Sequence, residues 1–315
     1  VHIQPSKRSF TSAFSDVLID IMKHDDKVVA ATSAMPDGTG IDKVLEQFPN
    51  RIWDTGICES HALDMLAGMA KTGCKPFFAV YSTFLQRAFD QAFQEVALQG
   101  LPVRLCLDRA GVVGGDGAVH HGFCDIALLR VLPNAVLLAA SDERTLQHGM
   151  KFMLSYNSGL SAIRYPRDVV TNRFPNSPPF VLGKAHQLLS TNQPKLAILG
   201  YGTTAIDALD AAIRVDSNVI DVYDARFAKP VDGDLIESLL EASIPIITVE
   251  DHSVIGGFVL AALLVLGCQK ASPTGYASYG QQGQQQPYVG GGCGVSPVSD
   301  SGEAPLQVSE SSLAA

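Results

Sequence analysis

Short apolar runs alternate with segments of helical periodicity along the first 170 residues. Continuous apolar character predicts buried strands at residues 27–32, 76–81, 103–108, 135–140 and 161–165, with a shorter one at 51–53. Apolar residues spaced three or four apart predict helices at residues 10–21, 62–70, 84–98 and 142–155, the last capped by Ser141. This alternation predicts an α/β fold: a doubly wound, mostly parallel sheet with helices on both faces.

A smaller α/β unit follows a proline-rich break. The segment TNRFPNSPPF, residues 171–180, contains three prolines and no apolar period, which is typical of a linker. Strands are then expected at residues 195–199, 219–223 and 245–249, with helices at 205–214 and 235–242. From about residue 271 the chain changes to Gly, Gln, Ser and Pro, and we expect a disordered tail. A prion-like interaction segment is the alternative for this tail.

These patterns divide the chain into five parts. They are an N-terminal linker (1–9), a larger α/β domain (10–170), the linker (171–180), a smaller and incomplete C-terminal α/β domain (181–270) and the polar tail (271–315). These boundaries follow from the apolar pattern.

The composition excludes several classes of function. A net charge of -9 without a basic cluster argues against nucleic acid or an anionic membrane surface as a partner. The longest apolar stretch near the C-terminal end, residues 254–266, is interrupted by two glycines and is too short to cross a bilayer, and the start shows no signal-peptide pattern. The six cysteines have no metal-type spacing, which favours reduced, mostly buried thiols. We therefore expect a cytoplasmic protein.

Two strings concentrate aromatic, cationic and acid–base side chains at expected strand ends. YSTFLQRAFDQ begins at Tyr81, and DRAGVVGGDGAVHHGFCD begins at Asp108. TGICESHALDMLAGMA surrounds Glu59 at the start of an expected helix, and SAIRYPRD ends at Asp168. Together, these segments are typical of half of an active site.

The four segments closely resemble the pyrimidine-binding domain of the 1-deoxy-D-xylulose-5-phosphate synthase family, whose coenzyme is thiamine diphosphate. The resemblance covers residues 10–266 and continues through ILGYGT, DVYDARFAKPVD and TVEDHSVIGGF. It implies a decarboxylative condensation of pyruvate with D-glyceraldehyde 3-phosphate, which feeds isoprenoid, thiamine and pyridoxal synthesis. Transketolase and the β subunits of 2-oxo-acid dehydrogenases share the domain plan and the glutamate, and remain alternatives.

Two residues of these segments resemble coenzyme-binding residues of the family. Its catalytic glutamate lies in a motif of the form IAEQHA, and here Glu59 lies in ICESHA, beginning at Ile57. The resemblance implies that Glu59 activates the coenzyme through N1′ of the aminopyrimidine, and we expect Ile57 and Cys58 to desolvate its carboxyl. On position alone, Glu59 is a helix-N-terminal carboxylate stabilised by the helix dipole. Phe84 resembles the aromatic that stacks on the pyrimidine; without the motif, it is a core residue.

Four cationic or phenolic side chains are candidates for substrate recognition. Tyr81, Arg109 and Arg167 resemble an anion-recognition set for the substrate phosphate or carboxylate, a task that suits the planar guanidinium group. Arg87 is a further candidate. Its alternative is an ion pair with Asp90, three residues along the same helix.

The glycine-rich string also supplies an acid–base pair. Asp116 and His120 resemble the family's DGxxH residues, which contact the substrate, and His120 is assigned a part in proton transfer. The alternative is a turn in which the two side chains satisfy one another. Of the adjacent histidines, His120 is preferred over His121.

The resemblance places the metal and the diphosphate elsewhere. Gly115-Asp116-Gly117 matches the start of a thiamine-diphosphate metal motif, but Asn134 follows too soon and lies between an expected helix and strand. We assign no metal ligand here and expect Mg²⁺ and diphosphate ligands on an N-terminal domain, in the same or another chain. Without that domain we expect the chain to be inactive, and family analogy suggests a homodimer. A non-catalytic truncated remnant or docking subunit is the remaining alternative.

Overall fold

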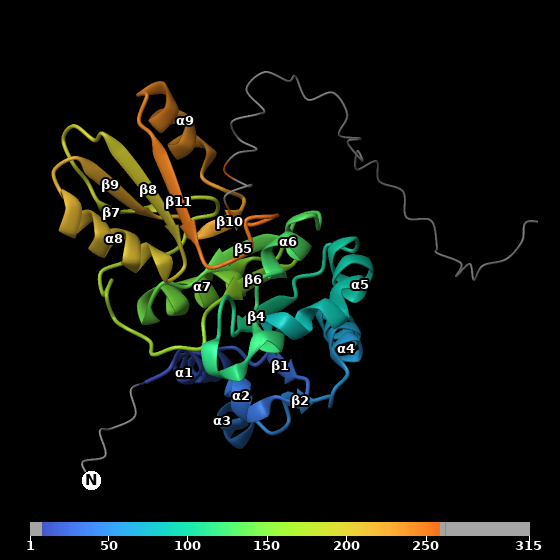
Figure 1. Ribbon diagram of the computed structural model, residues 1–315. Coiled ribbons are helices and arrows are strands. Elements are labelled where there is room, and N and C mark those ends of the chain that lie inside the picture. Colours follow the sequence, from blue (N-terminus) through green and yellow to red (C-terminus); the bar gives the residue numbers. More distant parts are fainter. Residues whose placement is uncertain (1–7, 259–261, 263–315) are drawn as a thin grey trace, which may run out of the picture. The chain divides into compact units, whose positions relative to one another are not determined.

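The structure is a computed structural model that describes residues 8–258 and residue 262 (Figure 1). Its larger sheet has seven strands in the order β10-β5-β6-β4-β3-β1-β2. The strands are β1 (Val28–Thr32), β2 (Ile52–Asp54), β3 (Lys75–Tyr81), β4 (Arg104–Asp108), β5 (Val136–Ala139), β6 (Ser161–Arg164) and β10 (Phe227–Lys229). All neighbouring pairs are parallel except β10 with β5. The mostly parallel sheet predicted from the sequence is therefore confirmed.

Helices cover both faces of the larger sheet. They are α1 (Phe10–His24), α2 (Pro36–Thr39), α3 (Ile41–Gln47), α4 (Glu59–Lys71), α5 (Phe89–Gln91), α6 (Asp125–Arg130) and α7 (Glu143–Ser155). Along β4, Leu105 and Leu107 pack with the cluster that includes α4 and α6, whereas Cys106 packs with the cluster that includes α1 and α7. Because successive strand residues point to opposite faces, this alternation buries the sheet on both sides, as a doubly wound fold requires.

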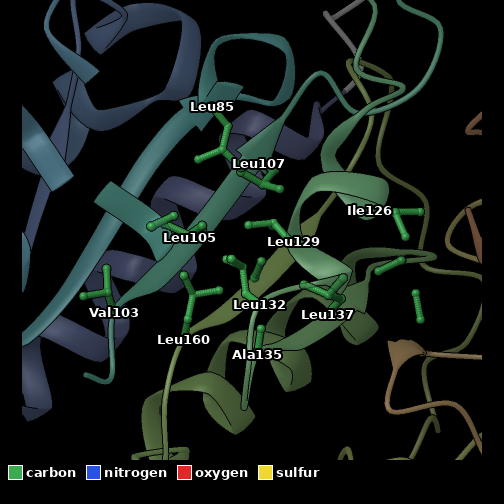
Figure 2. Packing of buried hydrophobic residues seen from close by; sticks show 14 of the residues in the cluster. Leu85, Val103, Leu105, Leu107, Ile126, Leu129, Leu132, Ala135, Leu137 and Leu160 are labelled. Atoms are coloured by element: carbon green, nitrogen blue, oxygen red, sulfur yellow. The ribbon is translucent and has the colours of Figure 1, made fainter. Parts of the chain in front are cut away.

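Leucine and other aliphatic side chains fill the first of these two clusters (Figure 2). Leu105 and Leu107 of β4 lie there with Leu129 of α6 and Leu137 of β5, all at 3% exposure or less. The same cluster extends to residues of the smaller sheet, including Leu199. The two sheets therefore share apolar packing.

The smaller sheet has four strands in the order β11-β8-β9-β7. Its elements are β7 (His186–Leu189), β8 (Leu196–Tyr201), α8 (Thr204–Val215), β9 (Ile220–Asp224), α9 (Gly233–Glu241) and β11 (Ile246–Glu250). β11, β8 and β9 run parallel, and β7 joins β9 antiparallel. The predicted second, smaller α/β unit is thus present.

Buried polar contacts join the two sheets. β10 follows β9 in the chain but pairs with β5 of the larger sheet. The Lys229 ammonium donates to the main-chain oxygen of Arg130 at 2.8 Å, and Ser141 Oγ donates to Asp224 Oδ2 at 3.0 Å. A strand of the second half of the sequence is thereby built into the sheet of the first half.

Local details differ from the sequence predictions in three places. Asp142, not Ser141, caps α7: its carboxylate accepts from the Thr145 amide at 2.9 Å, while Ser141 faces Asp224. The helix predicted at residues 84–98 is instead a 3₁₀ helix, η1 (Ser82–Ala88), then α5 and a π-helical turn, η2 (Ala92–Ala97). Of the four cysteines in the described residues, only Cys106 is buried. The predicted tail, residues 271–315, lies outside the described residues.

Candidate active site

Glu59 is the first residue of α4, and its side chain is only 2% exposed. Ile57 is 78% exposed and Cys58 is exposed too, so the expectation that these neighbours desolvate the carboxyl is wrong. Glu59 Oε1 accepts from Arg87 Nη1 at 2.8 Å. Its Oε2 makes no hydrogen bond with any residue that the structure describes. The carboxylate therefore keeps one oxygen for a ligand.

Arg87 links this carboxylate to the aromatic residues of η1. Its ion pair is with Glu59 and not with Asp90, so the local pair considered from the sequence is wrong. The guanidinium carbon lies 4.6 Å from the centre of the Phe84 ring. The guanidinium group is 49% exposed, whereas its partner carboxylate is buried, so the ion pair lies at the boundary between solvent and the interior.

Tyr81, Phe84 and His120 form an aromatic cluster where β3 ends. The Tyr81 and Phe84 rings stack with centroids 5.9 Å apart, and His120 meets them edge-on at 6.3 and 5.6 Å. A Cβ at Gly38 would lie 1.7 Å from the Tyr81 hydroxyl, so only glycine allows this ring position. Burial raises the pKa of Tyr81 and the nearby Arg109 opposes the shift, so the phenol stays a neutral hydrogen-bonding group.

His120 Nδ1 lies 2.9 Å from the main-chain oxygen of Asp116. Since a carbonyl oxygen only accepts, Nδ1 is the donor. The neutral ring then carries its lone pair on Nε2, which hydrogen-bonds none of the described residues. Nε2 is therefore the atom available for proton transfer.

Arg109 follows the end of β4 in the left-handed region, with φ of 60°. Its guanidinium carbon lies 3.8 Å from the centre of the Tyr81 ring, and Nη1 donates to the main-chain oxygen of Gly38 at 2.7 Å. Nε donates to Asp116 Oδ2 at 3.0 Å. The side chain is only 11% exposed, so stacking and hydrogen bonds fix its orientation.

Asp116 lies between two arginines. Besides Arg109, Arg167 Nη1 contacts its second oxygen at 2.9 Å, and Arg167 itself is 48% exposed. The carboxylate does not contact the His120 ring; only the main-chain oxygen of Asp116 does. Two guanidinium groups thus converge on one carboxylate.

Asp108 is a buried carboxyl that the sequence reasoning did not single out. It ends β4 with no exposure, accepts from Thr11 Oγ1 at 2.8 Å, and receives Arg109 Nη1 at 3.1 Å. Burial raises the pKa of Asp108 to about 6, against the opposing effects of Arg109 and Thr11. Its position as the last residue of a continuous apolar strand was the available signal. Asp108 orients Arg109.

The described residues contain no group of three or more His, Cys, Asp or Glu side chains arranged to hold a metal ion. Asn134 lies between α6 and β5, as predicted from the sequence. None of the helices in residues 8–258 is both long and apolar enough to span a membrane.

The chain belongs to the transketolase family. The family model for the transketolase pyrimidine binding domain matches residues 6–172, and that for the transketolase C-terminal domain matches residues 183–272. The sequence is also similar to 1-deoxy-D-xylulose-5-phosphate synthases: it is 43% identical over 268 residues to that of Gloeobacter violaceus and 41% identical over 276 residues to that of Methylobacillus flagellatus. The predicted resemblance is confirmed, and these comparisons support membership of a thiamine-diphosphate-dependent family.

The match covers 84% of this chain but 42% of the first relative, and 85% and 43% for the second. The chain thus spans less than half the length of these relatives. Among solved structures, a split-gene transketolase described as an inactive β4 tetramer has a TM-score of 0.74 at 26% identity, covering 84% of this chain and 87% of that one. Transketolase from Leishmania mexicana matches in fold, with a TM-score of 0.65 at 17% identity over 80% of this chain and 40% of its own.

Proposed function

We propose that this chain forms the C-terminal part of a 1-deoxy-D-xylulose-5-phosphate synthase, which condenses pyruvate with D-glyceraldehyde 3-phosphate and releases carbon dioxide. One observation carries the proposal: a buried carboxylate, an aromatic cluster and two converging arginines come from four segments of the sequence. Similarity to two synthases of this kind supports it.

The residues around Glu59 fit the pyrimidine end of thiamine diphosphate. Glu59 Oε2 has no partner among the described residues and can hydrogen-bond N1′, while the half-buried Phe84 ring offers a face for stacking. When bound, the coenzyme supplies a nucleophilic carbon and an electron sink for decarboxylation. Glu59 holds or shares the proton at N1′, and the partly exposed Arg87 can turn from Glu59 toward a substrate anion.

The substrate side of the proposed site is formed by Arg109, Arg167 and Tyr81. In the structure, the Asp116 carboxylate pairs with the guanidinium groups of Arg109 and Arg167. An incoming phosphate or carboxylate would take its place, and the released Asp116 carboxylate could then bind substrate hydroxyl groups. His120 Nε2 would exchange a proton with the substrate oxygen, while its Nδ1 bond to Asp116 keeps the ring oriented.

The site also needs a partner segment. The chain spans less than half the length of the two synthases that it resembles. We infer that an N-terminal domain, in the same or another polypeptide, supplies the ligands for Mg²⁺ and the diphosphate. The functional assembly is inferred to be a homodimer in the cytoplasm.

Reconstitution tests this proposal. The chain is purified alone and after co-expression with the N-terminal domain of a homologous synthase, and calorimetry measures thiamine-diphosphate uptake. The pair should bind the coenzyme and turn over, the lone chain should not turn over, and Glu59→Gln in the pair should lose at least about a thousandfold in kcat. Glu46→Gln, an exposed glutamate on α3, is the matched control. Robust turnover by the lone chain would contradict the split site.

A transketolase-type subunit is the second candidate, because the split-gene transketolase covers most of this chain at a TM-score of 0.74. The two reactions differ in their donor. The proposed synthase releases carbon dioxide from pyruvate, whereas a transketolase uses a ketose phosphate. Measuring carbon dioxide release in the reconstituted pair separates them. A pair that binds the coenzyme but uses neither donor would support a non-catalytic docking subunit.

A further inference from the structure

The glycine loop, residues 111–122, carries Asp116 and His120 and is anchored by a residue of the smaller unit. Asp251 directly follows β11, and its carboxylate accepts from the main-chain amide of Val112 at 3.3 Å (Oδ1) and 3.1 Å (Oδ2). A Cβ at Gly111 would lie 1.8 Å from Asp251 Oδ2. The first end of the loop therefore contacts the smaller unit so closely that only glycine fits.

The other end of the glycine loop is linked to the same residue only through Arg164. Arg164, 6% exposed at the end of β6, donates from Nη2 to the main-chain oxygens of Gly122 at 3.2 Å and Asp251 at 3.0 Å. Its Nε donates to Asp125 Oδ2 at 2.9 Å. Gly111 and Gly122 exchange main-chain hydrogen bonds of 2.7 and 2.8 Å. Both ends of the loop are thus joined at one point, with Asp251 as the common partner.

His252, the residue after Asp251, is buried beside Asp125, the partner of Arg164. Its side chain has no exposure, and Nδ1 donates to the main-chain oxygen of Ser253 at 2.9 Å. Its Nε2 lies 3.5 Å from Asp125 Oδ1 without forming a hydrogen bond. The Arg164 contacts with Asp125 and Gly122 are buried, whereas the Asp251–Val112 hydrogen bonds lie where solvent reaches them.

The glycine loop has a particular need for such an anchor. It contains five glycines in twelve residues, and glycine loses more conformational freedom on ordering than any other residue. Between its two ends, the contacts of Asp116 with Arg109 and Arg167 are ion pairs that a substrate anion would displace. Something other than the site itself must then hold the loop.

We propose that Asp251 is a positioning residue: its carboxylate fixes the first end of the glycine loop, its main-chain oxygen holds Arg164 at the other end, and together they set where Asp116 and His120 stand relative to the aromatic cluster. The consequence for catalysis rests on the proposed function, whereas the anchoring is a property of this chain alone. The smaller unit would then take part in organising the site.

Hydrogen exchange on the full chain tests the anchor without any assay of activity. In Asp251→Ala, the Val112 amide and, with it, the other amides of residues 111–122 should exchange about tenfold faster than in the wild type, because the hydrogen bonds from Val112 to a charged acceptor are lost while the main-chain contact with Arg164 remains. Asp251→Asn keeps one carbonyl oxygen toward Val112 and should restore most of the protection. Asp232→Ala is the control, since it removes the cap of α9 in the same unit without touching the loop.

Two results would overturn the proposal: unchanged exchange of the loop in Asp251→Ala, or an equal increase in Asp232→Ala. If Asp251→Ala fails to fold, Gly111→Ala disturbs the same contact from the loop side and should raise exchange of residues 111–122 in the same way.

In the reconstituted pair, Asp251→Ala should raise the KM for the phosphorylated substrate about tenfold and leave coenzyme affinity unchanged. Coenzyme affinity that falls in parallel would argue for general loss of structure. Should the wild-type pair show no synthase activity, the proposed function fails, while the exchange result still decides whether Asp251 anchors the loop.

Discussion

The ends of β4 and β9 are built alike but serve different parts of the molecule. Each strand ends in a fully buried aspartate, Asp108 or Asp224, and each is followed within two residues by an arginine in the left-handed region, Arg109 or Arg226. Burial raises the pKa of each aspartate to about 6, against the opposing arginine. The same arrangement, a buried aspartate at a strand end beside a nearby arginine, thus occurs in both sheets.

The two arginines differ in the groups that they bind. Arg109 stacks on Tyr81 and binds the carboxylate of Asp116, which belongs to the glycine loop. Arg226 stacks on Phe180 at 4.6 Å and donates to Ser177 Oγ and to the main-chain oxygens of Pro178 and Pro179. A carboxylate on a loop can be replaced by a substrate anion, but linker carbonyls cannot. Under the proposed function, the arginine at the end of β4 can take part in substrate binding, whereas the arginine at the end of β9 holds the linker in place.

The largest difference between the two strand ends should appear in stability. Arg226→Leu leaves Ser177 and two linker carbonyls without their donor, and should lower the free energy of unfolding by about 3–5 kcal/mol. Arg109→Leu should cost about 1–3 kcal/mol, because Asp116 keeps Arg167 and Asp108 keeps Thr11, and only the Gly38 oxygen loses its donor. Urea denaturation measures both, with exposed Arg214→Leu as the control. Equal losses of unfolding free energy in Arg109→Leu and Arg226→Leu would show that the two arginines do not differ in their structural role.

The pH dependence of stability should be shared by both strand ends. Because the folded-state pKa of Asp224 is raised from 3.8 to about 6, its contribution is present below about pH 4 and is lost as pH rises through about 6. Asp224→Asn should therefore gain about 2–3 kcal/mol relative to the wild type between about pH 4 and pH 7. Asp108→Asn should do the same. Carboxyls with lowered pKa values, such as Asp25, are present in both proteins, so their contributions cancel when the unfolding free energies of variant and wild type are subtracted. A pH-independent difference in unfolding free energy would show that these carboxyls ionise normally.

A conservative change of each arginine sharpens the functional side of the comparison. Arg109→Lys loses the planar fork that stacks on Tyr81 and should raise the KM for the phosphorylated substrate of the reconstituted pair about 10- to 100-fold. Arg226→Lys should leave this KM unchanged. Steady-state kinetics on both variants measures the contrast, and a similar KM change in each would place Arg109 outside substrate recognition.

The smallest effects should come from the hydroxyl groups that support the two carboxyls. Thr11 Oγ1 donates to Asp108 at 2.8 Å, and Ser141 Oγ donates to Asp224 at 3.0 Å. Thr11→Val and Ser141→Ala should each cost about 1–2 kcal/mol above about pH 6, and less near pH 4, where the carboxyls are protonated. Denaturation at both pH values measures this, and a cost that does not change with pH would assign the loss to packing.

The sequence predicted the larger sheet well because its strands are short and mostly apolar, and β1, β4, β5 and β6 are buried throughout. It did not predict β7, whose residues are only partly buried, or β10, which is three residues long and pairs with a strand far away in the chain. Periodicity within a segment contains no information about such a partner.

The candidate site was predictable only as far as motifs reach. The strings around Glu59, Phe84 and His120 identified residues that the structure brings to the same edge of the sheet, and their roles stay predictions. The partner of Arg87 could not be found, because Glu59 lies 28 residues away and the local Asp90 competed for the assignment. Asp108 and Asp251 were missed since buried carboxyls are recognised by their surroundings, which a sequence does not display.

The pairing of β10 with β5 has a consequence for the integrity of the larger sheet. β10 occupies the outer hydrogen-bonding edge of β5, whose four residues are fully apolar and buried. A shortened protein that ended at the linker would uncover this edge, and an uncovered apolar strand readily pairs with strands of other molecules. The C-terminal half of the sequence thereby protects the N-terminal half against aggregation.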